Sequence, residues 1–173
     1  MGDLPIRKNN RLQNYDYSQN GTYFVTLCVK GGHCILWEQV GANCVRPKLS
    51  NIGAVVEKYI KNINVSYDNI FVDKYVIMPN HIHMIVVIVG GDAHIAPKVK
   101  ENNYKGTMWA SSPTRIGIPS VIRSLKTLTT KQIGFSIWQR SFHDHIIRSE
   151  NEHLQIWQYI DENPRNLEND EYY

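Results

Sequence analysis

The chain has 173 residues, a net charge of +3 and a hydrophobic share of 42%, which is the profile of one globular domain with its own core. No apolar run reaches the roughly 18 residues needed to cross a bilayer, and the polar start MGDLPIRKNNR is not a secretory signal. Three cysteines without a C-x-x-C pair argue against a disulfide framework or a cysteine zinc site. We therefore expect residues 1–173 to form a single cytoplasmic domain without a membrane attachment.

Charge is distributed unevenly along the chain. Residues 93–148 hold nine Lys or Arg and two acidic residues, a net of +7. Residues 149–173 hold one Arg and seven acidic residues, a net of −6. A basic segment favours a partner with a phosphate backbone, although a solvated basic loop accounts for the charge equally well.

The first half of the chain predicts two strands and a helix. Residues 22–30, TYFVTLCVK, are β-branched and aromatic and predict a strand, and residues 34–40 predict a short second one. Ser50 is a suitable N-cap for a helix that runs to about Ile63, because its apolar residues recur every three or four positions.

Residues 70–78 and 81–89 predict two further strands, separated by Pro79 and Asn80. Two residues between two such runs indicate a hairpin. Residues 90–117 mix Gly, Pro, Lys, Asn and Ser, which predicts a flexible basic loop. A loop of this length in a compact domain is usually mobile or functional.

The last third predicts a helix, a strand and a second helix. Pro119 suits the first turn of a helix that ends at Gly134. Residues 135–148 predict a strand. Ser149 and Glu152 form the S-x-x-E capping pattern of a helix over about 150–161, which Pro164 stops, and an acidic tail follows over about 165–173.

The expected order, leaving aside the short 34–40 strand, is strand, helix, strand, strand, helix, strand and an extra C-terminal helix. The first six elements match the βαββαβ pattern of a ferredoxin-like α+β sandwich. The antiparallel sheet of such a sandwich has one face covered by helices and one face free for other work.

Two histidines stand one residue apart on the predicted strand 81–89. Side chains alternate across a strand, so His81 and His83 project from the same face, while Ile82 and Met84 point to the other. Two neighbouring imidazoles form half of a divalent metal site. Taken alone, this spacing is more often that of two surface histidines.

The C-terminal helix carries Tyr159 and Asn163, which lie one turn apart on the same face. Tyr159 flanks the apolar stripe of the helix and is available for chemistry. By spacing alone, a packing tyrosine with Asn163 at the helix end is the better interpretation.

Several blocks together resemble a known family. They are YVIMPNHIHMIV, IWQRSFHDHIIR, YIDENP and, near the N-terminus, YDYSQNGTYFVTLCV. This combination resembles the REP-associated tyrosine transposases, relatives of the HUH-class single-tyrosine transposases. The resemblance covers most of the chain, from about Tyr15 to Pro164.

The resemblance implies a role for each matching residue. His81 and His83 match the metal ligands, and Asn163 matches the polar residue that completes the metal site. Tyr159, on the extra C-terminal helix, matches the nucleophile. The family uses magnesium or manganese to nick and join single-stranded or hairpin DNA, which implies a transposase that forms a 5′-phosphotyrosine intermediate.

Further DNA contacts are expected in the basic part of the chain. The candidates for phosphate contacts are Arg123, Lys126, Lys131, Arg140 and Arg148. The candidates for stacking on unpaired bases are Tyr104, Trp109 and Trp138, although Trp138 lies mid-strand and is a better candidate for the core. His143 and His145 share a strand face. A second metal site or a DNA-facing edge is possible there, but a structural role is favoured, so they are left out of the catalytic set.

Two alternatives stay open at this point. The chain could be a non-catalytic single-strand nucleic-acid-binding domain derived from a transposase, or a metal-binding structural or regulatory protein. The oligomeric state, monomer or homodimer, is also open, as is whether Tyr159 serves its own subunit or a partner.

Overall fold

The structure, a computed structural model, describes residues 15–38, 48–90, 116–167, 170 and 172. Its elements in chain order are β1 (Gly21–Cys28), the 3₁₀ turn η1 (Lys30–Gly32), α1 (Asn51–Ser66), β2 (Ile70–Ile77), β3 (His81–Ile88), α2 (Ile118–Ile133), β4 (His143–Ile147), α3 (Glu150–Glu162) and the 3₁₀ turn η2 (Asn163–Arg165). The strand and helix order is the predicted one.

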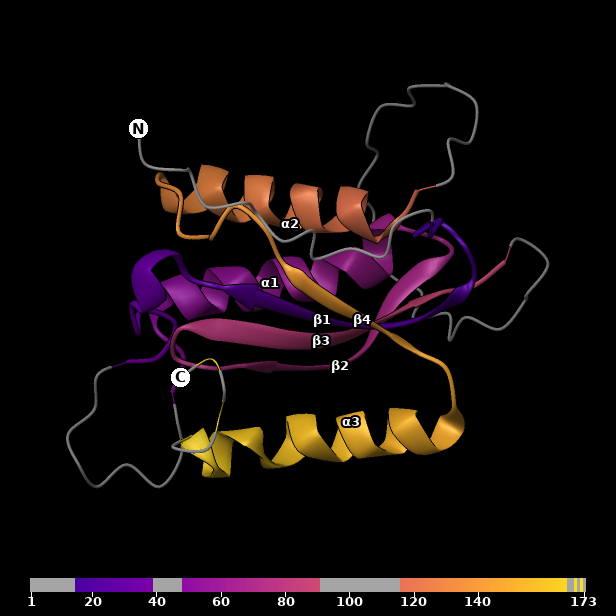
Figure 1. The fold of residues 1–173 in the computed structure, drawn as a ribbon. Coiled ribbons are helices and arrows are strands. Elements are labelled where there is room, and N and C mark those ends of the chain that lie inside the picture. The colour runs from indigo at the N-terminus through magenta and orange to yellow at the C-terminus, as the bar shows by residue number, and fades with distance from the viewer. Residues whose placement is uncertain (1–14, 39–47, 91–115, 168–169, 171, 173) are drawn as a thin grey trace, which may run out of the picture.

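The four strands form one antiparallel sheet in the order β2-β3-β1-β4. Figure 1 shows α1 and α2 on one face of this sheet and α3 on the other. The βαββαβ order with β1 and β3 in the centre is the ferredoxin-like arrangement, with an additional helix. The predicted fold class is confirmed.

The main core lies between the sheet and the α1/α2 layer. Ile82, Met84 and Val86 of β3 are completely buried there, as the alternation along the strand predicts. The odd-numbered residues of β1, including Val25 and Leu27, share this face. The even-numbered residues of β1 and the odd-numbered residues of β3, such as Phe24 and Ile85, therefore face α3.

Helix α1 is anchored at its start by a cap and a close backbone contact. The Ser50 hydroxyl accepts a hydrogen bond from the Gly53 amide at 3.0 Å, as the sequence predicts. Gly53 is buried, and a Cβ at that position would collide with the carbonyl oxygen of Leu36. The Leu36 carbonyl cannot easily withdraw, because it accepts from the Ser50 amide at 3.0 Å.

We expect Gly53→Ala to lower the free energy of unfolding by roughly 1–3 kcal/mol, because the added methyl group forces α1 away from Leu36. Asn51→Ala, at an exposed position two residues earlier, should change it by less than about 0.5 kcal/mol. Urea denaturation of both variants measures the difference. Equal stability of the two would show that the collision is relieved without cost.

The second helical layer consists of α3 alone. Ile160 is buried against Ile85 and Ile147 of the sheet, and Ile156 packs beside them. The Ser149 hydroxyl accepts from the Glu152 amide at 3.2 Å, which is half of the expected capping box. The Glu152 carboxylate does not return to Ser149. It accepts instead from the amide of Arg148 at 2.7 Å.

The predicted strand 135–148 is wrong over its first half, because β4 begins only at His143. Ile137 and Trp138 are consecutive and both buried, which breaks the alternation of a strand. Lys126 of α2 donates to the carbonyls of Gln139 and Ser141, both at 2.8 Å, and holds this segment away from a regular ladder.

Three other expectations differ from the structure or lie outside it. Residues 34–38 form no strand, only a bridge between Trp37 and Leu49, and residues 39–47 are not described. Helix α1 continues three residues past Ile63. The predicted loop lies almost wholly outside the described residues, with Tyr104 and Trp109. Within the described part, no helix is long and apolar enough to span a bilayer.

Candidate metal centre and tyrosine

The two histidines lie side by side on the α3 face of the central strands. His83 pairs with Thr26 across the β1–β3 ladder, and His81 pairs with Cys28. Both histidines are completely buried. Their Nε2 atoms are 3.1 Å apart. They are therefore interior groups, and the alternative that this spacing reflects two surface histidines is excluded.

Each imidazole is oriented by a hydrogen bond at Nδ1. Nδ1 of His81 lies 2.7 Å from Oδ1 of Asn80, and Nδ1 of His83 lies 2.8 Å from Oγ1 of Thr26. A bond at Nδ1 fixes the ring and leaves Nε2 as the ligand atom, the usual arrangement of metal-binding histidines. Burial, and then the neighbouring His83, lowers the pKa of His81 to about 4, so this ring is neutral at pH 7.

Tyr159 of α3 reaches the same cluster. Its hydroxyl lies 3.4 Å from Nε2 of His83, and its ring packs edge-on against His83 and Phe24. The residue stays 40% exposed, so a second molecule has access to it. Burial of the hydroxyl end, reinforced by Asp170, raises the pKa of Tyr159 to about 12. The phenol is therefore protonated at neutral pH.

Asn163 lies four residues after Tyr159, at the start of η2, and is 3% exposed. Neither its amide nitrogen nor its amide oxygen has a hydrogen-bond partner among the described residues. Its amide nevertheless acts electrostatically on both Tyr159 and Asp170, and it lowers the pKa of each. A buried amide without a geometric partner is a costly arrangement unless another group completes it.

Asp170 is the member of this cluster that the sequence did not reveal. Its Oδ2 lies 3.5 Å from Nε2 of His81 and 3.6 Å from Nε2 of His83, and its side chain is 1% exposed. The Tyr159 hydroxyl donates to the same oxygen at 3.2 Å. Burial alone would raise the pKa of Asp170, but hydrogen bonds from His83 and from the Tyr172 amide outweigh it and lower that pKa.

The donor set fits a divalent ion. Ligand atoms of His81, His83 and Asp170 all lie within 4.8 Å of one another. Two nitrogens that bind the same ion, each at about 2.1 Å and with a right angle between the two bonds, are about 3.0 Å apart. The two Nε2 atoms here are 3.1 Å apart, which is close to that separation. The uncompensated amide oxygen of Asn163 is a further neutral donor. These residues can hold a metal ion and leave positions open for other ligands.

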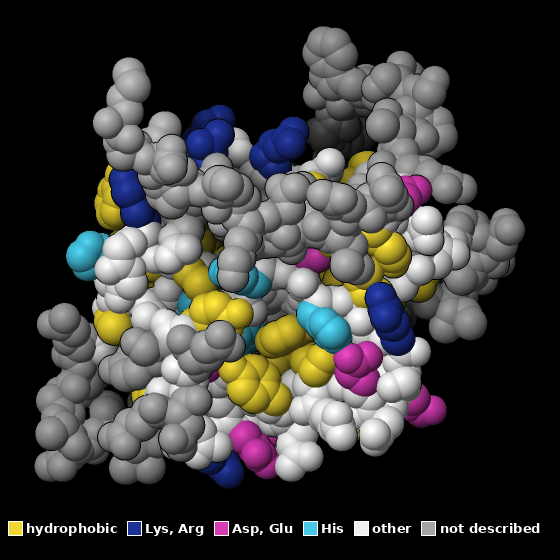
Figure 2. Space-filling view, in the orientation of Figure 1, with side chains coloured by type: hydrophobic (Ala, Val, Ile, Leu, Met, Phe, Trp, Pro, Cys, Tyr) yellow, Lys and Arg dark blue, Asp and Glu magenta, His cyan; other side chains and the backbone are white. Residues whose placement is uncertain are grey.

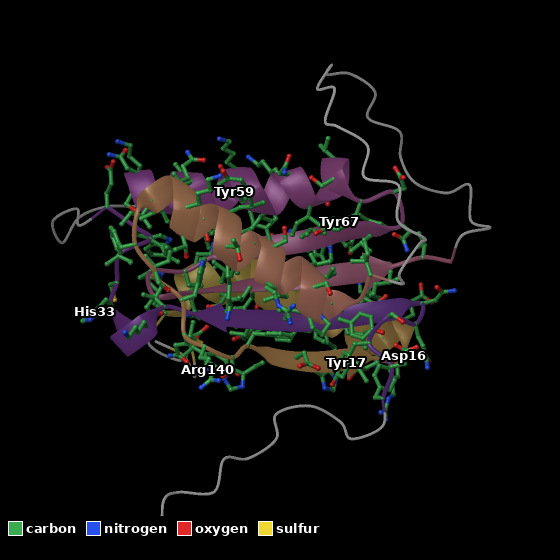
Figure 3. All side chains as sticks on the ribbon, turned by 90° about the horizontal axis from the view of Figure 1, so that it is seen from above. Asp16, Tyr17, His33, Tyr59, Tyr67 and Arg140 are labelled. Carbon is green, nitrogen blue, oxygen red and sulfur yellow. The ribbon has the colours of Figure 1, made fainter. Side chains whose placement is uncertain are left out.

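The structure brings together three of the five predicted phosphate contacts. Arg123 and Lys126 of α2, with Arg140, line a cavity of about 230 Å³ that Phe142 also borders. Figure 3 shows Arg140 on the segment that connects α2 to β4. This segment touches the β1 end next to the histidines, because the Gln139 amide donates to the Cys28 carbonyl at 2.9 Å.

The other two cations lie elsewhere. Lys131 is exposed near the end of α2. Arg148 borders a separate groove of about 430 Å³ beside the start of α3, together with Phe71 and Asp73. On the face shown in Figure 2, several Lys and Arg side chains gather at the α2 side and several Asp and Glu side chains at the α3 side.

The remaining candidates have structural contacts. Trp138 is 5% exposed and donates to the Thr129 hydroxyl at 2.8 Å, so it belongs to the core. His145 is paired with Glu152 of α3 at 2.6 Å. His143 lies against the ring of Tyr172 at 5.5 Å between centroids. Tyr172 also packs against His81 and His83, so His143 adjoins the cluster through this ring, but among the described residues no hydrogen bond joins His143 or His145 to His81, His83 or Tyr159.

Comparison with known proteins places the chain in a family. No family model matches it. An uncharacterised protein of Haemophilus influenzae is 31% identical over 175 residues, which cover 96% of this chain and 93% of that protein. The chain belongs to the same family as that protein.

Solved structures place the fold. A REP-associated tyrosine transposase bound to a REP hairpin superposes with a TM-score of 0.62 at 20% identity, over 91% of this chain and 74% of that chain. This chain has the fold of a REP-associated tyrosine transposase. A candidate transposase from Deinococcus radiodurans R1 is less similar, with a TM-score of 0.46 at 15% identity over 90% of this chain and 96% of that chain. The family resemblance found in the motifs is confirmed at the level of the fold.

Proposed function

We propose that this protein is a metal-dependent transposase that nicks and joins single-stranded or hairpin DNA through Tyr159. The observation that carries the proposal is the convergence of residues far apart in the sequence. The Tyr159 hydroxyl on α3 lies 3.4 Å from Nε2 of His83 on β3, beside a second histidine and a buried amide. A structural tyrosine has no need of such neighbours.

The reaction is a transfer of a phosphoryl group to Tyr159. The Tyr159 oxygen attacks the phosphorus, the bond from phosphorus to the 3′ oxygen breaks, and the phenol loses its proton while the 3′ oxygen gains one. The products are a 5′-phosphotyrosine and a free 3′-hydroxyl. Because the ester retains the bond energy, attack by another 3′-hydroxyl reverses the step and joins two strands.

His81, His83 and Asn163 hold magnesium or manganese in this proposal. When bound, the ion polarises the scissile phosphate and screens its charge. The chain's own residues supply the rest. The hydrogen bonds to Asn80 and Thr26 orient the imidazoles, and α3 positions the phenol of Tyr159. With a pKa of about 12 the phenol is protonated at neutral pH, so it has to lose its proton during the attack.

Tyr159 serves its own subunit in this proposal. Its hydroxyl reaches the His83 of the same chain, and Ile156 and Ile160 seat α3 on the same sheet. The connection from β4 to α3 is only two residues, Arg148 and Ser149. A monomer therefore contains all the reacting groups, and no exchange of α3 between subunits is required.

The DNA partner is expected to follow the basic side of the molecule. Arg123, Lys126 and Arg140 gather in one cavity, and the segment that carries Arg140 adjoins the β1 end next to His81. In this proposal, single-stranded DNA bound in the cavity approaches the metal centre from the end of β1 that pairs with His81. A hairpin is a suitable substrate because the transposase with this fold was solved bound to one.

A covalent adduct tests the proposal directly. The full chain is incubated with labelled single-stranded hairpin DNA and Mn²⁺, then denatured and separated by electrophoresis. Label that migrates with the protein and is released as phosphotyrosine on proteolysis supports the proposal. Tight binding of the same DNA without any adduct would favour the non-catalytic DNA-binding alternative.

The basic cavity yields a prediction about salt. Each phosphate contact on a single strand contributes about 0.7 to the slope of log affinity against log salt. Arg123→Ala with Arg140→Ala should therefore flatten the slope by about 1.4 and weaken hairpin binding at 50 mM salt. Fluorescence anisotropy between 50 and 300 mM salt measures both quantities.

The matched control removes two charges from a neighbouring helix. Lys58→Ala with Lys61→Ala changes the net charge equally, but both residues lie on α1 and neither borders the cavity. This control should keep the wild-type slope. Equal flattening in both double variants would mean that net charge alone, and not the cavity, attracts the DNA.

A further inference from the structure

Asp170 is placed as a metal ligand is placed. Its Oδ2 points at the two histidine nitrogens, at 3.5 Å from Nε2 of His81 and 3.6 Å from Nε2 of His83. Neighbouring ligands of an octahedral ion with bonds of about 2.1 Å are about 3.0 Å apart. A movement of a few tenths of an ångström would bring the carboxylate into the same coordination sphere.

Two hydrogen bonds position Asp170 and Tyr172. The Tyr172 amide donates to Oδ1 of Asp170 at 2.7 Å, which leaves Oδ2 directed at the histidines. The Tyr172 carbonyl accepts from the amide of Asn80 at 2.9 Å. Asn80 also orients His81, so one side chain positions both a histidine and the segment with the carboxylate.

The charge of Asp170 needs a cation. The Asp170 side chain is only 1% exposed, and its only ion-pair partners among the described residues are His81 and His83. The Tyr159 hydroxyl and the Asn163 amide also interact with this carboxylate, and both groups are neutral. A buried carboxylate without a full positive charge beside it is costly, and a divalent ion between it and the imidazoles removes that cost.

We propose that Asp170 is a direct ligand of the same ion as His81 and His83, supplied by the C-terminal segment. The inference rests on the proposed function, because it requires that a divalent ion binds the two histidines. It adds an anionic oxygen to a site that otherwise has only neutral donors. Two imidazoles and a carboxylate favour a harder ion than imidazoles alone, because carboxylate oxygen suits manganese and magnesium.

Metal binding without DNA tests this assignment. Titration of the full chain with Mn²⁺, followed by the EPR signal of free Mn²⁺, measures affinity independently of any reaction. Asp170→Asn should lower Mn²⁺ affinity about tenfold or more. Asp68→Asn, a control at an exposed carboxylate between α1 and β2, should leave it unchanged.

A second ion separates loss of a ligand from a general disturbance. Imidazole donors suit Ni²⁺, so Asp170→Asn should reduce Ni²⁺ affinity less than Mn²⁺ affinity. Equal losses for the two ions, or an unchanged Mn²⁺ affinity in Asp170→Asn, would overturn the assignment. Circular dichroism of each ion-free variant checks that it is folded.

His83→Gln distinguishes this inference from the proposed function. Loss of Mn²⁺ binding in both His83→Gln and Asp170→Asn supports the two together. If Mn²⁺ binding is lost in His83→Gln but not in Asp170→Asn, the histidines bind the ion and Asp170 is not a ligand. A wild-type chain that binds no Mn²⁺ rejects the metal centre itself.

Discussion

A Tyr159→Phe variant is expected to form no denaturation-resistant adduct with hairpin DNA, and to lose nicking by a factor on the order of 10³ or more. The loss is this large because the variant lacks the one atom that would bond to phosphorus, and no partial reaction replaces a missing nucleophile. Gel analysis of the adduct and single-turnover nicking in Mn²⁺ measure the two effects.

Folding and DNA binding should survive this change. Among the described residues, the hydroxyl donates to Asp170, lies at the limit of contact with His83 and interacts with the Asn163 amide. All three partners keep other neighbours in the cluster, so removal of the hydroxyl costs about 1 kcal/mol or less. Tyr67→Phe is the matched control, because Tyr67 lies at the end of α1 on the opposite side of the sheet (Figure 3). An adduct that persists in Tyr159→Phe would assign the nucleophile to another tyrosine.

Replacement of both His81 and His83 by Ala is expected to abolish metal-dependent nicking and also to destabilise the protein. The two side chains are completely buried, and each has a hydrogen bond at Nδ1 that would be lost. A combined cost of roughly 2–4 kcal/mol follows from the cavity and the unpaired Thr26 hydroxyl. That corresponds to a fall in Tm of about 10 °C for a chain of this size.

The assay must therefore be run well below the melting temperature of the variant. His33→Ala is the control, since His33 is exposed and lies at the periphery of the molecule (Figure 3). It should retain both nicking and Tm. Wild-type nicking by a folded double variant would remove the metal centre from the mechanism.

The order of strands and helices could be predicted from local patterns. The alternation of β3 correctly separates the histidines from Ile82 and Met84. Ser50 caps the start of α1 and Gly134 caps the end of α2, as their residue types predict. Which strands pair with one another in the sheet could not be predicted from local patterns, because it depends on contacts between residues far apart in the sequence. The segment before β4 is joined to α2 by Lys126, which donates to carbonyls thirteen and fifteen residues later, and no local pattern indicates these bonds.

The candidate site was predictable where its residues lie in motifs. His81, His83, Tyr159 and Asn163 each belong to a block with recognisable spacing. Asp170 does not, since it is one of seven acidic residues after Arg148 and no local pattern distinguishes it. Its place depends on Asn80, ninety residues earlier, which holds Tyr172. Contacts over that separation are decided by tertiary packing.

Helix α3 rests on the sheet through a much smaller apolar contact than α1 and α2. Among the described residues, Ile156, Ile160 and the Tyr159 ring join it to the cluster that includes Ile85 and Phe24, whereas the other layer holds most of the buried residues. We therefore expect α3 to detach at a lower free-energy cost than global unfolding, so that Tyr159 would separate from the histidines before the sheet itself unfolds.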